Sequence, residues 1–192
     1  MKAKIISCNV GRPVNLDNHG KPVRTGIFKE PVDGPIHLEQ LGVRGDTIAN
    51  LMVHGGPTKA VYIYPAEHYP WWAEKLGRDS LPWGTLGENI TIENIGGTAG
   101  DPVNEKTVHI GDRFRCGSAL LEVTKPRLPC FKLGLKLGTN QALRWMIERR
   151  CWGFYVAVIE PGEVRAGDTI ELVATVPGRP TVFDEGIRKS DE

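Results

Sequence analysis

The chain has 192 residues, of which 40% are hydrophobic and 24% charged, a composition typical of one globular domain. Its formal net charge of +1 provides no overall field for nucleic acid or an anionic membrane, so we expect neither as a partner and any basic site must be local. No apolar run approaches the roughly 18 residues that span a bilayer, and the first residues lack the apolar core of a signal peptide. The four cysteines show no C-x-x-C spacing, which argues against a disulfide framework or a structural zinc site. These features predict a cytoplasmic protein.

Short strands separated by turns are predicted for the first half of the chain. The glycine and proline content, 23 and 14 residues, favours many strands joined by tight turns. Strands are expected at 4–10, 25–29, 36–41, 61–64 and 91–93, with turns at 15–22 and 31–35. A helix is predicted over 66–76, in two pieces because of Pro70. The nearby aromatic residues Tyr69, Trp71, Trp72 and Trp83 favour packing against the sheet, although stacking on a flat ligand is an alternative.

The second half continues the same pattern with one clear helix. A hairpin is expected from 108–114 and 119–123 around Gly117 and Ser118, followed by a helix over 140–150 and strands at 154–159 and 169–173. Cys151 lies on the apolar face of that helix and is interpreted as core. We therefore predict a mainly β fold with a few helices, one domain over 1–175, and a polar, turn-rich and mobile tail over 176–192.

A single cysteine stands out in the segment KPRLPCFK, residues 125–132. Pro126 and Pro129 each fix φ and remove a backbone donor, so the segment is expected to be neither a helix interior nor a central strand but a stiff loop that presents Cys130. The cations Lys125, Arg127 and Lys132 favour the thiolate form, which attacks electrophiles and binds metals. The alternative is that Cys130 is a small buried hydrophobic residue, the usual fate of a free cysteine. The spacing alone leaves both interpretations open.

Further cations and a glycine pair lie upstream. Lys21 and Arg24 bracket the start of the predicted second strand, and Arg44 lies between two glycines; each is either a solvated or paired charge or an anion ligand. In HGGP, residues 54–57, the backbone N–H groups of Gly55 and Gly56 can converge on an oxyanion. His54 beside that turn is more often structural than catalytic.

Several of these segments, taken in order, resemble the MOSC domain, the module at the carboxyl end of molybdenum-cofactor sulfurases, and especially its stand-alone bacterial, YiiM-like members. The matching stretches are TGIFKEPV (25–32), LGVRGD (41–46), HGGP (54–57), GEN (87–89), IGD (110–112) and PRLPCFKL (126–133). Each stretch alone carries little weight, but the ordered set spans nearly all of residues 1–175.

The resemblance implies a closed or partly closed β-barrel with peripheral helices. It implies that Cys130 ligates molybdenum held by a pterin dithiolene, the molybdenum cofactor, and that the activity is reduction of N-hydroxylated compounds such as 6-hydroxylaminopurine. A soft thiolate suits such a metal. The phosphate of the cofactor requires cations and backbone donors, and the candidates are Lys21, Arg24, Arg44, Gly55, Gly56, Arg127 and Lys132. Asn89 or His54 is expected to orient substrate or water.

Electrons for this reaction are expected from a separate reductase, because the chain shows no flavin, haem or iron–sulfur motif. The alternative from another class is a carrier in which Cys130 bears a persulfide or the barrel stores the cofactor. A cysteine hydrolase using Cys130 and His54 is weaker, since no orienting third group is recognisable. The sequence leaves the oligomeric state and the physiological substrate open.

Overall fold

The first strand, β1 (Lys2–Gly11), buries alternate side chains over most of its length, as a strand with one face on a core must. The computed structural model describes residues 1–18, 20–46, 55–95 and 101–191. Within them, seven strands pair in the order β13–β9–β10–β11–β7–β8–β1, and β1 also pairs with β13. This last pairing closes the sheet into a barrel. The mainly β fold and the closed barrel expected from the sequence are therefore confirmed.

The barrel strands after β1 are β7 (Val61–Pro65), β8 (Ile90–Asn94), β9 (Arg113–Cys116), β10 (Ala119–Pro126), β11 (Phe154–Glu160) and β13 (Thr169–Ala174). Their inward side chains are largely β-branched or aromatic, and Ile5, Ile63, Ile92 and Phe114 are fully buried. Strands β7 and β8 run parallel, and the helical connection between them supplies the crossover that a parallel pair requires.

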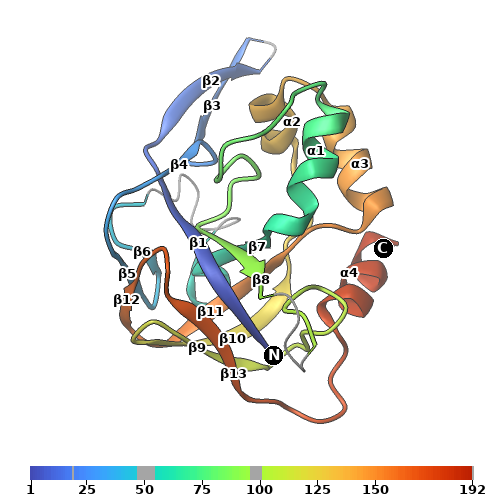
Figure 1. Cartoon of the computed structure of the whole chain (residues 1–192). Helices are drawn as coiled ribbons and strands as arrows, with labels where there is room; N and C mark the ends of the chain where they lie inside the picture. The colour runs from blue at the N-terminus through green and yellow to red at the C-terminus, as the bar shows by residue number, and fades with distance from the viewer. Residues whose placement is uncertain (19, 47–54, 96–100, 192) are drawn as a thin grey trace.

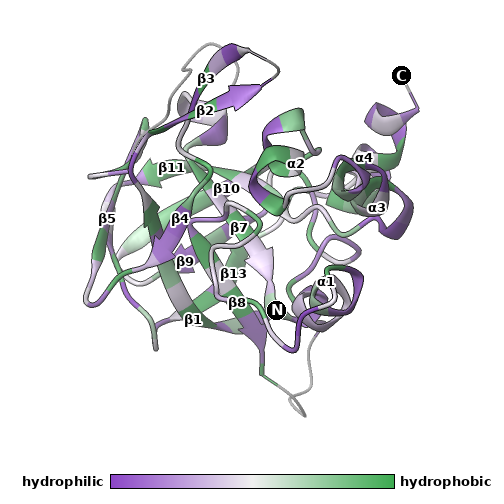
Figure 2. Ribbon diagram, turned by 90° about the horizontal axis from the view of Figure 1, so that it is seen from above, coloured by the Kyte–Doolittle hydropathy of each residue, from purple (hydrophilic) through white to green (hydrophobic). Residues whose placement is uncertain are grey.

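Smaller elements surround the barrel. Strand β4 (Lys29–Pro31) extends the sheet beyond β1, β5 (Ile36–Glu39), β6 (Gly42–Val43) and β12 (Gly162–Val164) form a second sheet, and β2 (Val14–Asn18) pairs with β3 (Lys21–Thr25). The helices are η1 (Pro57–Lys59), η2 (Ala66–His68), α1 (Tyr69–Lys75), α2 (Phe131–Leu137), α3 (Gln141–Arg149) and α4 (Val182–Ser190). Figures 1 and 2 show the four α-helices together on one side of the barrel and the small sheet on the other. Among the described residues, no helix is both long and apolar enough to cross a membrane.

The predicted second strand over 25–29 is wrong. The chain instead forms a hairpin from β2 and β3, where a turn was expected, and re-enters the sheet at Lys29. The hairpin projects from the barrel, as Figure 1 shows, and pairs with itself, so its side chains are at most half-buried apart from Thr25. A strand without a buried face lacks the alternation that sequence analysis detects.

The expected turn-rich tail is also wrong over Val182–Ser190, which form α4. Thr181 and Asp184 make a capping box at its start, and burial of Val182 anchors it. Gly186 lies directly against the indole of Trp152, where a Cβ atom would come within 2.1 Å of the ring. The helix is short and mostly polar, so its single apolar stripe was hidden in the composition of the tail.

Candidate functional site

Cys130 lies where β10 leaves the barrel and α2 begins. Lys125 and Pro126 still pair with Tyr155 and Phe154 of β11, so the strand runs further than the prolines predicted. Pro126 is tolerated because it ends the strand, just after an irregularity in the register between Val123 and Lys125. The connecting residues end at Cys130, which adopts an extended conformation as the N-cap of α2. Its carbonyl accepts the Leu133 N–H at 2.9 Å, while its side chain makes no capping hydrogen bond. The Sγ atom is therefore not used to hold the helix.

Cys130 is the accessible thiol of the four. It is half-buried, whereas Cys8, Cys116 and Cys151 are all at most 1% exposed. Burial raises the pKa of Cys8 and of Cys151 to about 12, and raises that of Cys116 further. These three thiols stay protonated and inert, which leaves Cys130 as the candidate ligand or nucleophile.

Arg127 supplies a buried positive charge next to Cys130. Only 5% of Arg127 is exposed, and its guanidinium lies over the ring of Tyr62 at 5.3 Å from the centroid. It also approaches the Met146 sulfur at 3.9 Å and hydrogen-bonds Tyr155. Among the described residues Arg127 makes no ion pair, so its charge is not cancelled by a neighbouring carboxylate. Cys130 is one of the groups that interact electrostatically with it.

A buried ion pair fixes the strands around this corner of the barrel. Lys29 and Asp46 bond directly, with 9% and 5% of their side chains exposed. Asp46 also accepts the Gly11 N–H and the Asn89 side-chain amide, both at 2.9 Å. Burial lowers the pKa of Lys29, and the Asp46 carboxylate opposes that shift. One carboxylate thus joins the end of β1, the start of β4 and the residue before β8.

The amide group of Asn89 is engaged on both atoms. Its Oδ1 accepts the Tyr62 N–H at 3.2 Å, and its Nδ2 donates to Asp46 and to the Asn9 carbonyl. It therefore holds β7 and β1 together in this structure, and its expected role toward substrate or water stays a prediction.

Glu88 is a fully buried carboxylate beside Asn89. Its Oε1 accepts the Tyr69 hydroxyl, the Gly84 N–H and the Thr91 hydroxyl. Its Oε2 has no hydrogen-bond partner in the part of the chain that the structure describes. The charges of Lys29 and Lys136 interact with this carboxylate and compensate its burial.

Lys136 binds α2, at whose start Cys130 lies, to the segments that precede β4 and β8. Its Nζ donates to the Ile27 carbonyl at 2.8 Å and to the Gly84 carbonyl at 2.6 Å. Burial lowers its pKa to about 8, since two carbonyls replace the water shell of the ammonium, and Glu88 only partly offsets this.

We expect Lys136 to make stability depend on alkaline pH. Because its pKa is about 8 in the folded protein and near 10.5 in the unfolded chain, the unfolded state binds more protons between these values. The contribution of Lys136 to the free energy of unfolding should therefore rise from pH 8 to 10.5, by about 1.4 kcal/mol for each unit of pKa difference, while the buried thiols with raised pKa values contribute with the opposite sign above about pH 9. The free energy of unfolding of the native chain minus that of Lys136→Met, both measured by urea denaturation, should rise across this range. Lys4→Met, an exposed change on β1, should keep the native slope; parallel curves for native and Lys136→Met proteins would refute the assignment.

Hydrogen bonds link the segments that carry several of the predicted cations and glycines to the strand and helix on either side of Cys130. Lys132, two residues after the cysteine, donates to the Arg24 carbonyl at 3.3 Å and so links α2 to the β2–β3 hairpin, whose Lys21 and Arg24 side chains are exposed. The Gly55–Gly56 turn, with φ of 115° and 81°, leads into η1.

That turn is bound to the end of β10. The Thr58 carbonyl accepts the Thr124 hydroxyl at 2.6 Å, and the Thr58 hydroxyl accepts from Lys125 Nζ at 3.2 Å. The glycine turn is thereby joined to the strand that carries the Cys130 loop.

Two other predicted residues are placed differently. Arg44 pairs with Glu39 at 2.6 Å and keeps 64% of its side chain exposed, so its guanidinium is engaged within the small sheet. His54 lies outside the described residues. For both residues the expected role at the site stays a prediction.

Among the buried charges Lys29, Asp46, Glu88 and Lys136, the sequence suggested Asp46 and Glu88 only as salt-bridge partners of the predicted cations and did not indicate Lys29 or Lys136. Three of them lie inside the stretches that carry the family resemblance, which was the available signal. Their pairing joins residues 17 or more positions apart, and a pairing of that kind is visible only in the fold.

Known proteins match this chain over most of its length. The family model of the MOSC domain matches residues 50–171. The chain is 39% identical to the uncharacterized protein YflK of Bacillus subtilis over 88% of this chain and 73% of that one. It is 37% identical to protein YiiM of Escherichia coli over 82% and 66%, and 36% identical to a protein named reductase from Gibberella moniliformis over 80% and 26%. The crystal structure of YiiM from Geobacillus stearothermophilus superposes with a TM-score of 0.75 at 29% identity, covering 96% of this chain and 82% of that one.

Proposed function

The chain belongs to the MOSC domain family, and on that premise we propose that it is a molybdenum-cofactor-binding oxidoreductase that reduces N-hydroxylated compounds, including N-hydroxylated purine bases such as 6-hydroxylaminopurine. The observation that carries the proposal is the placement of Cys130, the accessible thiol of four, beside the buried Arg127 guanidinium. The cytoplasm is its proposed location.

The residues around Cys130 fit an anionic cofactor that binds its metal through sulfur. Cys130 offers a soft sulfur ligand whose Sγ holds no capping bond. The charge of Arg127 has no carboxylate partner among the described residues, so it can stabilise negative charge on that sulfur and on the cofactor. The Gly55–Gly56 turn and Lys132 offer backbone and side-chain donors for a phosphate.

The overall reaction balances as one N-hydroxylated substrate plus two electrons and two protons giving the amine and water, with cleavage of the N–O bond. When bound, the cofactor supplies the two-electron chemistry. In this proposal Cys130 ligates the metal and Arg127 tunes the charge around the ligand sulfur. The Lys29–Asp46 pair and Lys136 hold the strands and α2 that position both residues.

Electrons are proposed to come from a separate reductase protein. The Gibberella relative is named a reductase, and this chain matches 26% of it, which supports redox chemistry for the shared part. The match to the E. coli relative likewise covers only 66% of that protein. An activity or partner of the whole relatives is therefore attributed to this chain only as part of the proposal.

The experiment is a direct assay of the metal-loaded protein. Chain produced in cells that make molybdenum cofactor, supplied with an artificial electron donor, should convert 6-hydroxylaminopurine to adenine, followed by chromatography. A sample with near-stoichiometric molybdenum that yields no amine from this base or from other N-hydroxylated compounds would refute the reductase.

The alternative is a carrier of sulfur or of cofactor, since an accessible thiol beside a cation also suits persulfide chemistry. Intact-protein mass spectrometry distinguishes the two. Metal-free protein in which Cys130 gains the mass of one sulfur atom would favour the carrier over the reductase.

A further inference from the structure

A cavity that Cys130 does not line lies between α1, the end of β8 and the chain around Leu81. Its volume is about 570 Å³, within the range of small-molecule sites. None of the residues described above around Cys130 lines it except Tyr69, whose hydroxyl reaches Glu88. The lining residues are Ala66, Glu67, Tyr69, Pro70, Ala73, Asp79, Ser80, Leu81, Trp83, Glu93 and Asn94.

The floor of this cavity is apolar and aromatic. Tyr69, Ala73 and Leu81 are at most 8% exposed, and the half-buried Trp83 meets Tyr69 edge to face with centroids 4.6 Å apart. The Tyr69 hydroxyl is held by Glu88, which fixes the ring. A rigid aromatic wall of this kind suits a flat or apolar body and, through its π faces, a cation.

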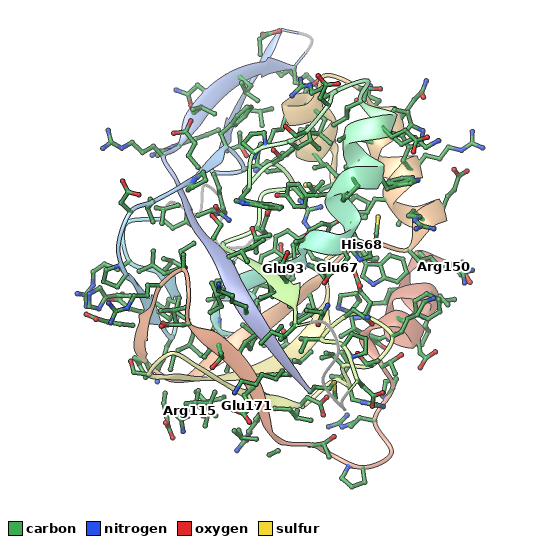
Figure 3. All side chains as sticks on the ribbon, viewed as in Figure 1. Glu67, His68, Glu93, Arg115, Arg150 and Glu171 are labelled. Carbon is green, nitrogen blue, oxygen red and sulfur yellow. The ribbon has the colours of Figure 1, made fainter. Side chains whose placement is uncertain are left out.

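The rim is negatively charged. Glu67, Asp79 and Glu93 line the cavity and are exposed, and no cationic residue lines it. Figure 3 shows Glu67 and Glu93 next to each other below the lower end of α1. Glu67 is oriented by hydrogen bonds from the backbone and side chain of Asn94, at 2.8 and 2.9 Å. Asp79 and Glu93 make no ion pair with any residue that the structure describes, although the exposed Lys4 of β1 lies opposite Glu93 in the register of β1 and β8.

We propose that this cavity binds a small organic cation, with an amidinium, guanidinium or ammonium group on an apolar aromatic body. The aromatic floor would bury the body of the ligand while Asp79 and Glu93 pair with its charge. An amidinium matches a carboxylate with two parallel hydrogen bonds, and the partly enclosed position strengthens the attraction relative to open water. This site does not depend on the reductase activity or on a bound cofactor.

Isothermal titration calorimetry of the whole chain with benzamidine, and with neutral benzamide of nearly the same shape, tests the proposal. Benzamidine should bind at least about tenfold more tightly than benzamide, a difference of about 1.4 kcal/mol. The double variant Asp79→Asn/Glu93→Gln should lose at least tenfold in benzamidine affinity and little in benzamide affinity. Both changes are on exposed side chains, so the fold should be retained.

Two controls separate this site from the rest of the protein. Glu171→Gln removes an exposed carboxylate on β13, which Figure 3 shows far from Glu67 and Glu93, and should leave affinity unchanged. Cys130→Ala should also bind benzamidine as the native chain does, even if it loses metal and activity. Equal affinity for the two probes, absence of benzamidine binding at millimolar concentration, or full binding by the double variant would overturn the proposal.

Discussion

Replacing Asp46 with asparagine is expected to lower the free energy of unfolding by about 3–5 kcal/mol, the usual cost of leaving a buried charge unpaired. The Lys29 ammonium, 9% exposed, would lose its counter-charge. The Gly11 N–H and the Asn89 amide would keep only a weaker, neutral acceptor. Because these contacts join β1, β4 and β8, the loss should be visible as a lower midpoint in urea denaturation at neutral pH.

A matched control is the exposed pair between Lys2 and Glu171, whose atoms are 3.5 Å apart with about half of each side chain exposed. Glu171→Gln should cost less than about 1 kcal/mol. The double variant Lys29→Met/Asp46→Asn removes both charges, keeps an acceptor for the Gly11 N–H and the Asn89 amide, and should recover much of the loss of Asp46→Asn. If Asp46→Asn costs no more than Glu171→Gln, the buried pair does not hold this corner of the barrel.

Cys130→Ala is expected to reduce the proposed activity by more than about a hundredfold while leaving stability within about 0.5 kcal/mol of native. The expected loss exceeds that seen for residues that only support a metal ligand. The small effect on stability follows from the position, because the Cys130 side chain is half-buried and makes no capping bond to α2. Steady-state kinetics and urea denaturation of the same preparations measure the two quantities. A variant that retains activity, or that loses it only by unfolding, would contradict the role of the sulfur.

Much of the barrel was predictable because its strands bury one face. Alternation and β-branched residues located β1, β7, β8 and β11 closely, and the ordered motifs identified the closed barrel. The elements without such a signal were missed or misplaced. The β2–β3 hairpin pairs only with itself, and α4 buries one narrow stripe against Trp152.

The start of α2 was hidden for a different reason. Pro126 and Pro129 predicted a stiff loop over the whole segment, whereas β10 continues to Pro126, and Gly134 in the following segment weakened its helical pattern. The structure explains that glycine, because a Cβ at Gly134 would lie 2.8 Å from the Asn140 side chain where α2 packs against the start of α3. The glycine that allows the two helices to pack closely also lowers the helix propensity of the segment, so α2 was not predicted.

The sequence identified several residues of the candidate site, but not the contacts that these residues make. The cysteine, Arg127 and the glycine turn stood out by type and spacing, and the structure places them around one end of β10. The buried charges that support them could not be paired from sequence, because Lys29, Asp46 and Glu88 meet only after β1, β4 and β8 have assembled. Arg44 was predicted as a cofactor ligand because it is a cation within a motif, but in the structure it pairs with Glu39.

The most direct test of the central claim is the molybdenum content of the purified protein. The native chain, Cys130→Ala and the control Cys116→Ala would be produced in cells that make molybdenum cofactor, and bound metal would be quantified by mass spectrometry. Cys116, the last residue of β9, is fully buried and pairs with Ala119 at the opposite end of β10 from Cys130, so its loss should leave metal binding intact. The account predicts near-stoichiometric molybdenum in the native and Cys116→Ala proteins and little in Cys130→Ala. Equal molybdenum in all three, or none in the native chain, would contradict it.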